Sequence, residues 1–332
     1  IYQSLYNQTH SQTHFDYLIT CYLEQGENQK AADITKEQIH RFPKSFYYQI
    51  KLATIYVRMK QTDDANDIFE RTIKKSSKEL EYCLEAGQAC LDNKVDSIAQ
   101  IIYENGQSKF PDNATIAKQL SEVYLQREEN QKLINTYITL LRHNNEELEF
   151  VESQLQYTLY EKKSSELQVL LATTLFTLTE KEPKTLVFKE LLLWLLIQNK
   201  DFEKAFDISK DIDIQNDKDG EGLLELGKIA LSNNDYAQAT KCFSYVVQKG
   251  SMGDYYEEAL RNLLETSYDR LFKSYAPIDL NQVKGLETEY QKALEELGES
   301  KSSAEIFKNL AHIRAFYLDN AESAINVLQK AI

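Results

Sequence analysis

The chain has 332 residues, of which 42% are apolar and 27% charged, and its net charge is −14. An acidic surface repels the phosphate backbone of nucleic acids, so the composition disfavours DNA or RNA as a partner. Glycine and proline, the residues that break helices, number only 10 and 4. We therefore predict an all-α chain.

The first part of the chain follows a period of 34 residues, with units that start at residues 12, 46, 80 and 114. The third unit shows the pattern clearly: small residues at Gly87 and Ala99, an aromatic ring at Tyr103, and Pro111 at the end. A repeat of this length with small residues between two apolar stripes indicates a helix–turn–helix unit. Four regular units are thus expected over 12–145, after residues 1–8, which resemble the end of an earlier helix.

The register slips twice in the rest of the chain. An atypical hairpin is expected over 146–185, two regular units over 186–253, and a long atypical hairpin around Ala276-Pro277 over 254–299. Residues 303–332 match a terminal unit that is cut short. With about eight hairpins and no long linker between them, we predict a single continuous domain over 1–332.

This spacing resembles that of the tetratricopeptide repeat (TPR) family, strongly over 12–145 and 186–250 and weakly elsewhere. The resemblance implies a right-handed α-solenoid of stacked hairpins with a concave groove, and a protein or peptide as partner. The abundance of Tyr, Asn, Lys and Ile is similar to that of exported TPR proteins of Bacteroidota. It favours a periplasmic or exported location, with a cytoplasmic one as the alternative.

One TPR subgroup grips the C-terminal carboxylate of chaperones with Lys and Asn side chains. At the matching positions this chain has Asp16 and Thr20 in the first unit, Lys51 in the second, and Glu81 and Glu85 in the third. The two glutamates would repel a carboxylate. That specific function is therefore rejected for these units.

The first-helix positions that face the groove in TPR proteins give the candidate partner-binding residues. Mixed aromatic and polar side chains suit peptide recognition, because tyrosine combines apolar area with a hydrogen-bonding tip. In the first two units the candidates are Asp16, Tyr17, Thr20, Tyr47, Ile50, Lys51 and Arg58. The alternative is structural, because aromatic side chains also fill the space between helices.

The unit that starts at residue 186 carries an apolar stripe at groove positions, with Leu191 and Trp194 as further candidates. Either this stripe packs against the irregular hairpin before it, or Trp194 is a hot spot for a partner. The apolar run from Leu186 to Ile197 is too short to cross a membrane, so no membrane span is expected.

No catalytic group, metal site or cofactor site is predicted. The Gly222–Lys228 segment lacks the Ser or Thr of a phosphate-binding loop, and His10 and His14 have no third ligand beside them. The four cysteines are expected to be small buried hydrophobes. We predict a non-enzymatic scaffold that binds a peptide or partner helix in the groove, or else the sensor or regulatory arm of a larger signalling protein. The sequence leaves the oligomeric state open.

Overall fold

The computed structural model describes residues 2–161, 163–273, 277–298 and 303–330, and every regular element in these ranges is a helix. The all-α prediction is confirmed. Ala276 of the expected loop lies outside the described residues. Contacts within the chain divide it into two compact units, Ile1–Leu170 and Leu171–Ile332. The single domain over 1–332 stays a prediction.

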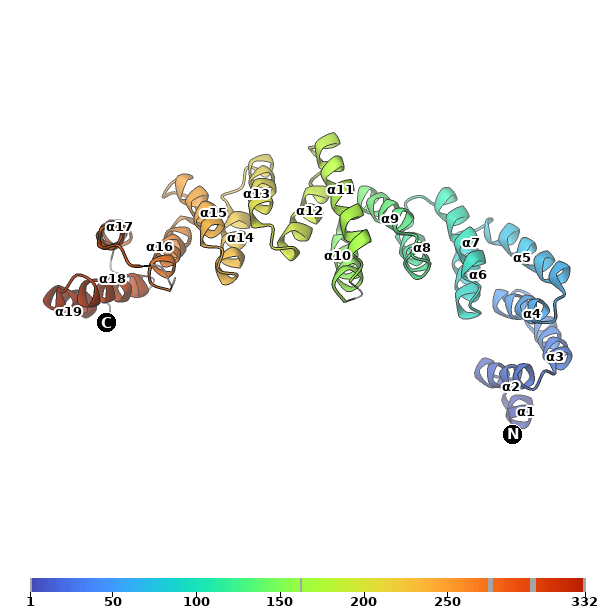
Figure 1. Ribbon diagram of the computed structural model, residues 1–332. Helices are drawn as coiled ribbons and strands as arrows, with labels where there is room; N and C mark the ends of the chain where they lie inside the picture. Colours follow the sequence, from blue (N-terminus) through green and yellow to red (C-terminus); the bar gives the residue numbers. More distant parts are fainter. Residues whose placement is uncertain (1, 162, 274–276, 299–302, 331–332) are drawn as a thin grey trace. The chain divides into compact units, whose positions relative to one another are not determined.

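Unit 1 begins with α1 (Tyr2–Thr9) and continues with four helix pairs (Figure 1). Their first helices begin at residues 12, 46, 80 and 114, which are the predicted starts. The pairs are α2 (Gln12–Glu24) with α3 (Asn28–Arg41), α4 (Phe46–Arg58) with α5 (Thr62–Ser76), α6 (Leu80–Asp92) with α7 (Asp96–Lys109), and α8 (Ala114–Gln126) with α9 (Asn130–His143).

In unit 1, the first helices of successive hairpins lie beside each other, and so do the second helices. The first helices α4 and α6 contact each other, and so do the second helices α5 and α7. Figure 1 shows the first helices along one edge of this unit and the second helices along the other. The unit therefore has two layers, and apolar side chains from consecutive hairpins fill the space between them.

The first slip in register coincides with irregular helices. A 3₁₀ turn (Asn145–Glu147) leads into α10 (Leu148–Gln156), which continues as a π-helical turn (Tyr157–Glu161). The helix that follows, α11 (Ser165–Lys181), has 17 residues and crosses the boundary between the units.

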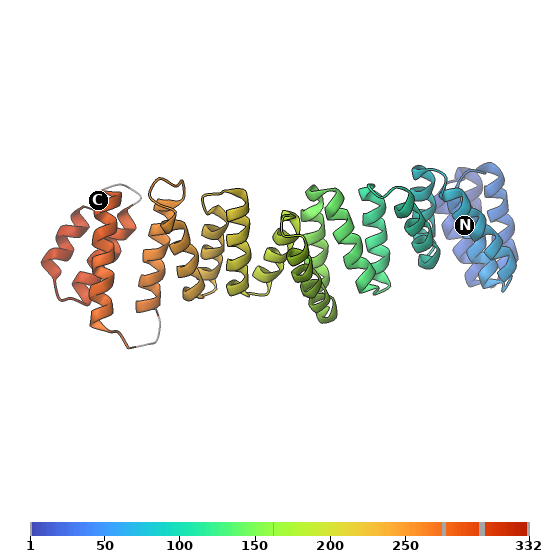
Figure 2. The ribbon, with the colours of Figure 1, turned by 90° about the horizontal axis from the view of Figure 1, so that it is seen from above.

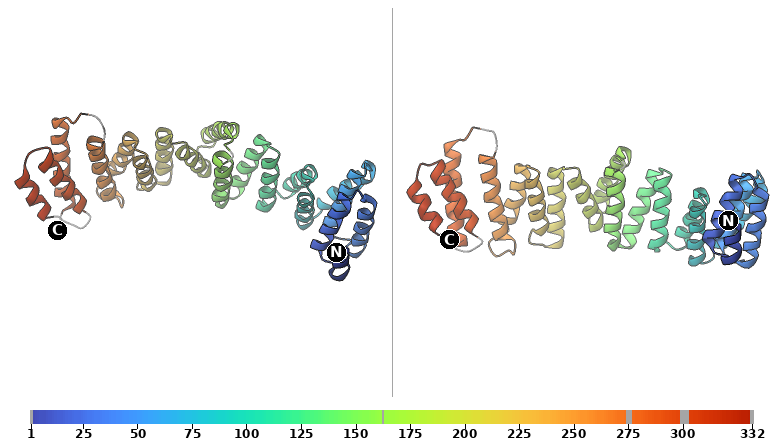
Figure 3. Two further views of the ribbon diagram at one scale, coloured as in Figure 1. Left: turned by 60° about the horizontal axis from the view of Figure 1, so that its bottom comes forward. Right: turned by 90° about the horizontal axis from the view of Figure 1, so that it is seen from below.

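Unit 2 returns to helix pairs after α11, with the two helices of each pair side by side (Figures 2 and 3). The third pair is the long hairpin, with helices of 17 and 18 residues. The pairs are α12 (Leu186–Gln198) with α13 (Phe202–Asn216), α14 (Glu221–Ser232) with α15 (Tyr236–Gln248), α16 (Tyr256–Phe272) with α17 (Leu280–Leu297), and α18 (Ala304–Phe316) with α19 (Ala321–Gln329).

The repeated small residues lie where the two helices of a hairpin approach most closely. A Cβ atom added to Gly87 would lie 2.3 Å from Cζ of Tyr103, and one added to Gly227 would lie 2.6 Å from the Phe243 ring. Both distances are far inside van der Waals contact, so the aromatic ring occupies the space that a side chain would need. The alanines of the repeat pattern in the second helices are fully buried: Ala31, Ala65, Ala99, Ala205 and Ala239.

The turn inside each regular hairpin contains one residue in the left-handed region, at φ between 58° and 76°. Only one of them is glycine, although glycine alone adopts this conformation without strain. The six equivalent residues are Gly26, Lys60, Lys94, Glu128, Lys200 and Asn234. After the turn at Lys60, Thr62 and Asp63 form part of the first turn of α5.

A long polar side chain near the end of the second helices ties one hairpin to the turn before it. Lys109 donates to the carbonyl oxygens of Ser77 and Lys78 at 2.7 and 2.9 Å, and Lys249 donates to that of Lys218 at 2.5 Å. These carbonyls follow the ends of α5 and α13, where a helix leaves acceptors without intrahelical partners. A cation there also interacts favourably with the helix dipole.

We expect Ala99→Leu to destabilise the protein by about 1–3 kcal/mol, because the larger side chain overpacks a completely buried helix contact. Denaturant unfolding of the whole chain measures this. Asn105→Leu, on the exposed side of the same helix, is the control, with a change of about 0.5 kcal/mol or less. Equal stability of the Ala99→Leu variant and the original chain would contradict the packing described here.

Lys94→Gly should stabilise the protein by about 0.5–1 kcal/mol, because relief of left-handed strain exceeds the added entropy of the unfolded chain. The reverse change, Gly26→Lys, should destabilise it at the equivalent turn. Thermal unfolding of both variants tests the pair. A lower melting temperature for Lys94→Gly would show that the Lys94 side chain contributes more than its backbone strain costs.

Candidate functional site

Three of the predicted partner-binding residues come together between α2 and α4. The Tyr47 hydroxyl donates to Oδ1 of Asp16 at 2.5 Å, and Nζ of Lys51 lies 3.8 Å from the same oxygen. The Lys51 ammonium also lies 5.6 Å from the centre of the Tyr47 ring, within range of a cation–π interaction. Asp16 is separated from Tyr47 by 31 positions and from Lys51 by 35, and the three form one cluster because consecutive first helices are neighbours.

Burial and charge act against each other in this cluster. Burial lowers the pKa of Lys51, while the carboxylates of Asp16 and Asp92 raise it and partly offset the effect. Burial and the hydrogen bond to Asp16 both raise the pKa of Tyr47. The tyrosine is therefore neutral and acts as a donor, and its hydroxyl holds the carboxylate beside the ammonium.

Other predicted residues flank the cluster. The Tyr17 side chain is 51% exposed and stacks on Tyr2, with ring centroids 5.2 Å apart. Thr20 is exposed one helical turn further on. The exposed Arg58 donates to the carbonyl oxygen of Leu23 at 2.5 Å, in the last turn of α2. This face therefore combines exposed side chains with charged groups already held in place.

Two predicted residues are not available at the surface. Ile50 is completely buried and Leu191 is 1% exposed. Both were assigned to open groove positions, and the structure corrects that assignment, because an apolar side chain is stabilised by burial rather than by exposure to water. Trp194 is half-buried, which fits neither a fully packed nor a freely exposed side chain, and its role stays a prediction.

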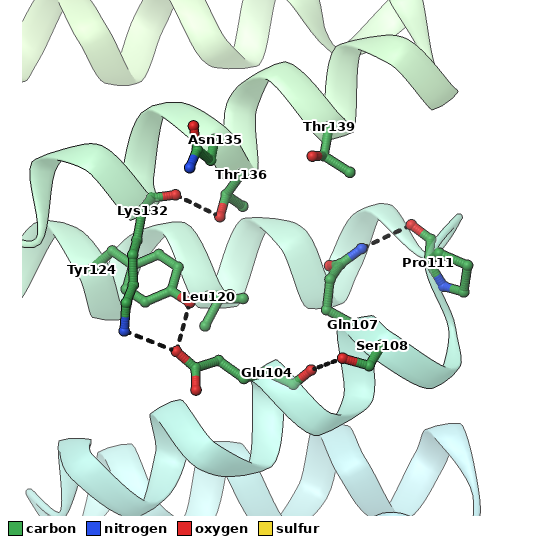
Figure 4. A pocket seen from close by; sticks show the side chains of 10 residues that line it. All are labelled: Glu104, Gln107, Ser108, Pro111, Leu120, Tyr124, Lys132, Asn135, Thr136 and Thr139. Carbon is green, nitrogen blue, oxygen red and sulfur yellow. Dashed lines mark hydrogen bonds and ion pairs between the residues drawn. The ribbon is translucent and has the colours of Figure 1, made fainter. Parts of the chain in front are cut away.

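The sequence did not predict a hollow of about 400 Å³ between α7, α8 and α9 (Figure 4). Leu120 and Pro111 supply apolar surface, and Thr136 and Thr139 line the side formed by α9. Glu104 lies at its polar end. These residues come from three helices and a turn, so no single stretch of sequence signals the hollow.

Glu104 is the centre of a hydrogen-bond network in this hollow. Its Oε1 accepts from the Tyr124 hydroxyl at 2.8 Å, from the Gln100 amide at 2.9 Å and from Lys132 Nζ at 3.2 Å. Burial alone would raise the pKa of Glu104, but these bonds outweigh burial and lower it. Lys132 also pairs with Glu129 at 2.9 Å. The ionic groups at the polar end are therefore paired with each other.

The histidine pair and the glycine segment considered for metal and phosphate binding make other interactions. Nδ1 of His10 faces the guanidinium of Arg41 at 2.8 Å, an arrangement that opposes a metal cation, and His14 bonds to Thr9 and Ser11. Gly222 and Gly227 lie within α14 rather than in an open loop. Among the described residues, no group of three or more His, Cys, Asp or Glu side chains could hold a metal ion.

The cysteines are mostly buried thiols. Cys83, Cys90 and Cys242 are buried, while Cys21 is half-buried. Burial raises the pKa of Cys83 to about 11 and that of Cys90 to about 12. A thiol with such a pKa is a poor nucleophile at neutral pH.

Comparison with known proteins agrees with the helical-hairpin architecture. Residues 47–78, which include nearly all of the α4–α5 pair, match the model of the tetratricopeptide repeat family. Residues 47–78 thus match a tetratricopeptide repeat, as the spacing of that unit predicted. No curated protein matches it. No helix among the described residues is long and apolar enough to cross a membrane.

Two solved structures are similar at low sequence identity. A tetratricopeptide repeat protein from Parabacteroides merdae is 15% identical over 86% of this chain and 92% of its own, with a TM-score of 0.28. A structure of Naa15/Naa10 bound to HypK-THB is 16% identical over 96% of this chain and 58% of its own, with a TM-score of 0.25. At such scores the matches do not define the arrangement of this chain or its partner.

Glu104→Gln should reduce stability by about 0.5–1 kcal/mol at pH 7, a modest value because the carboxylate is partly exposed. The lowered pKa of Glu104 means that its stabilisation is complete above the pKa of the unfolded chain, about 4.3, and disappears as the pH falls through the folded-state pKa. Unfolding of both proteins at pH 7 and at about pH 3 measures this difference. A difference that persists at low pH would contradict the electrostatic origin. Glu70→Gln, on exposed α5 surface, is the control.

Proposed function

We propose that this chain is a non-enzymatic scaffold that binds a peptide or partner helix in the groove formed by its first helices. Tetratricopeptide repeats mediate protein–protein interaction. The site proposed for this chain is the first-helix face of unit 1, which we define as the exposed and half-exposed side chains of α2, α4, α6 and α8 at the groove positions of the repeat.

The observation that carries this proposal is the cluster of Asp16, Tyr47 and Lys51. It joins two successive first helices through a hydrogen bond and an ion pair on the face proposed to bind the partner. Side chains that are already held in place lose little conformational entropy when a partner binds. Next to them Tyr17 offers an exposed aromatic ring, the kind of side chain that contributes most to binding at interfaces.

The test uses peptides selected by display against the intact chain. Hydrogen exchange with a selected peptide bound should show added protection in α2, α4 and α6. The Tyr17→Ala/Thr20→Ala double variant should weaken binding by about tenfold, because both side chains are exposed and their loss changes the surface rather than the core.

Ile101→Ala provides the matched control. Ile101 is 41% exposed on α7, a second helix, so the variant removes exposed apolar surface from the opposite layer. Its affinity for the peptide should be unchanged. Protection restricted to α3, α5 and α7, or a loss of binding only in the control, would contradict the proposed site.

A further inference from the structure

One helix of the first-helix face carries only negative charge. The α6 sequence from Leu80 to Asp92 contains no lysine, arginine or histidine. Its exposed polar side chains are Glu81, Glu85, Gln88 and Asp92. Their spacing of four, three and four residues places them on one stripe of the helix.

Nearby cations offset the charge of this stripe only in part, because Lys51 interacts with both Asp16 and Asp92. Lys51 on α4 is engaged with Asp16, and Lys118 on α8 pairs with Glu147 at 2.6 Å and covers the Phe150 ring at 4.7 Å. Arg58 is exposed at the end of α4, but its guanidinium donates to the end of α2.

The carboxylates of the stripe differ in their hydrogen-bond partners. Glu85 accepts the backbone N–H of Phe46 at 3.3 Å and so helps to cap α4. Asp92 accepts from the Gln88 amide at 2.8 Å, a neutral donor, and interacts at longer range with Lys51, whose pKa it raises. Glu81 is exposed in the first turn of α6. The stripe therefore keeps a net negative charge.

Apolar surface lies beside these carboxylates. Leu84 and Leu91 on α6 are half-buried, and Val57 on the neighbouring α4 is 54% exposed. The face thus alternates carboxylates with apolar side chains at helical spacing. A helix that binds such a surface needs cations every three to four residues with apolar side chains between them.

We propose that the partner of the first-helix face is a basic amphipathic segment that lies along α6 as a helix. This rests on the proposed function and adds the chemistry of the partner. Lysine or arginine side chains meet Glu81 and Asp92, and leucine-like side chains cover Leu84 and Leu91. Exposed ion pairs add little affinity one by one, so the apolar contacts hold the segment while the charges steer and select it.

The probe is a synthetic peptide of about 18 residues, helical, with lysine at one-turn spacing and leucine between, labelled for fluorescence anisotropy. A second peptide has glutamate in place of lysine. We expect the lysine peptide to bind at least about tenfold more tightly, and its affinity to fall as salt rises from about 50 to 300 mM. Equal affinity of the two peptides would overturn the proposal.

The variant Glu81→Lys/Asp92→Lys should weaken binding of the lysine peptide by about tenfold or more. The two changes affect the α6 dipole in opposite directions, since Glu81 lies in the first turn and Asp92 ends the helix, so stability should change little. Glu37→Lys/Glu70→Lys alters net charge equally at exposed positions of α3 and α5, and should change affinity by less than about threefold.

The results separate this proposal from the proposed function. If both double variants weaken binding equally, the net charge of the chain attracts the peptide and the α6 stripe does not, which overturns the inference. If display yields neutral or acidic peptides that protect α2, α4 and α6, the basic partner is wrong while the proposed site stands. If the lysine peptide binds but protects only α3, α5 and α7, both are wrong.

Discussion

The structure depends on how closely the two helices of a hairpin approach each other. At that point the ring of Tyr103 occupies the place where a side chain on Gly87 would be, and Phe243 does the same opposite Gly227. The other regular units have residues of reciprocal size at the two positions: a small residue opposite a ring in Ala53/Phe69 and Ser121/Tyr137, and a large residue opposite a small one in Ile19/Thr35 and Leu193/Ser209. The combined volume of the two side chains is thus similar in each hairpin although the residues differ, as close packing requires.

This constraint explains why so much of the fold could be predicted from the sequence. Only a few side chains fit at the closest approach, so small and large residues recur there with a fixed period in the sequence. That period predicted where the first helices of the hairpins begin, at residues 12, 46, 80 and 114. The turns are less constrained. Lys60, Lys94 and Glu128 adopt a conformation that favours glycine, and nothing in their side chains marks it. The chain tolerates the strain because the packed helices on both sides fix the turn.

The candidate site was predicted only in part, for a related reason. Asp16, Tyr47 and Lys51 were identified by position, yet their hydrogen bonds depend on how consecutive hairpins are rotated against each other. Ile50 shows the same limit, since its place in the repeat indicated an open groove position but its side chain is buried. The hollow around Glu104 uses contacts 20 to 28 residues apart, between hairpins rather than within one. The repeat pattern in the sequence reflects contacts within a hairpin, whereas contacts between hairpins are less apparent in it.

On α6, the side that packs within the hairpin differs from the side that faces outward. One side of α6 is fixed by packing: Ala86, Gly87 and Cys90 are buried there and cannot change without disturbing the second helix. The opposite side carries Glu81, Gln88 and Asp92, which pack against nothing that fixes their identity. An exposed stripe of one charge sign is unfavourable for an isolated helix, because like charges one turn apart repel each other. Since hairpin stability comes mainly from packing with neighbours, the repeat can sustain that cost. The fold therefore does not fix the charge on the exposed side of α6.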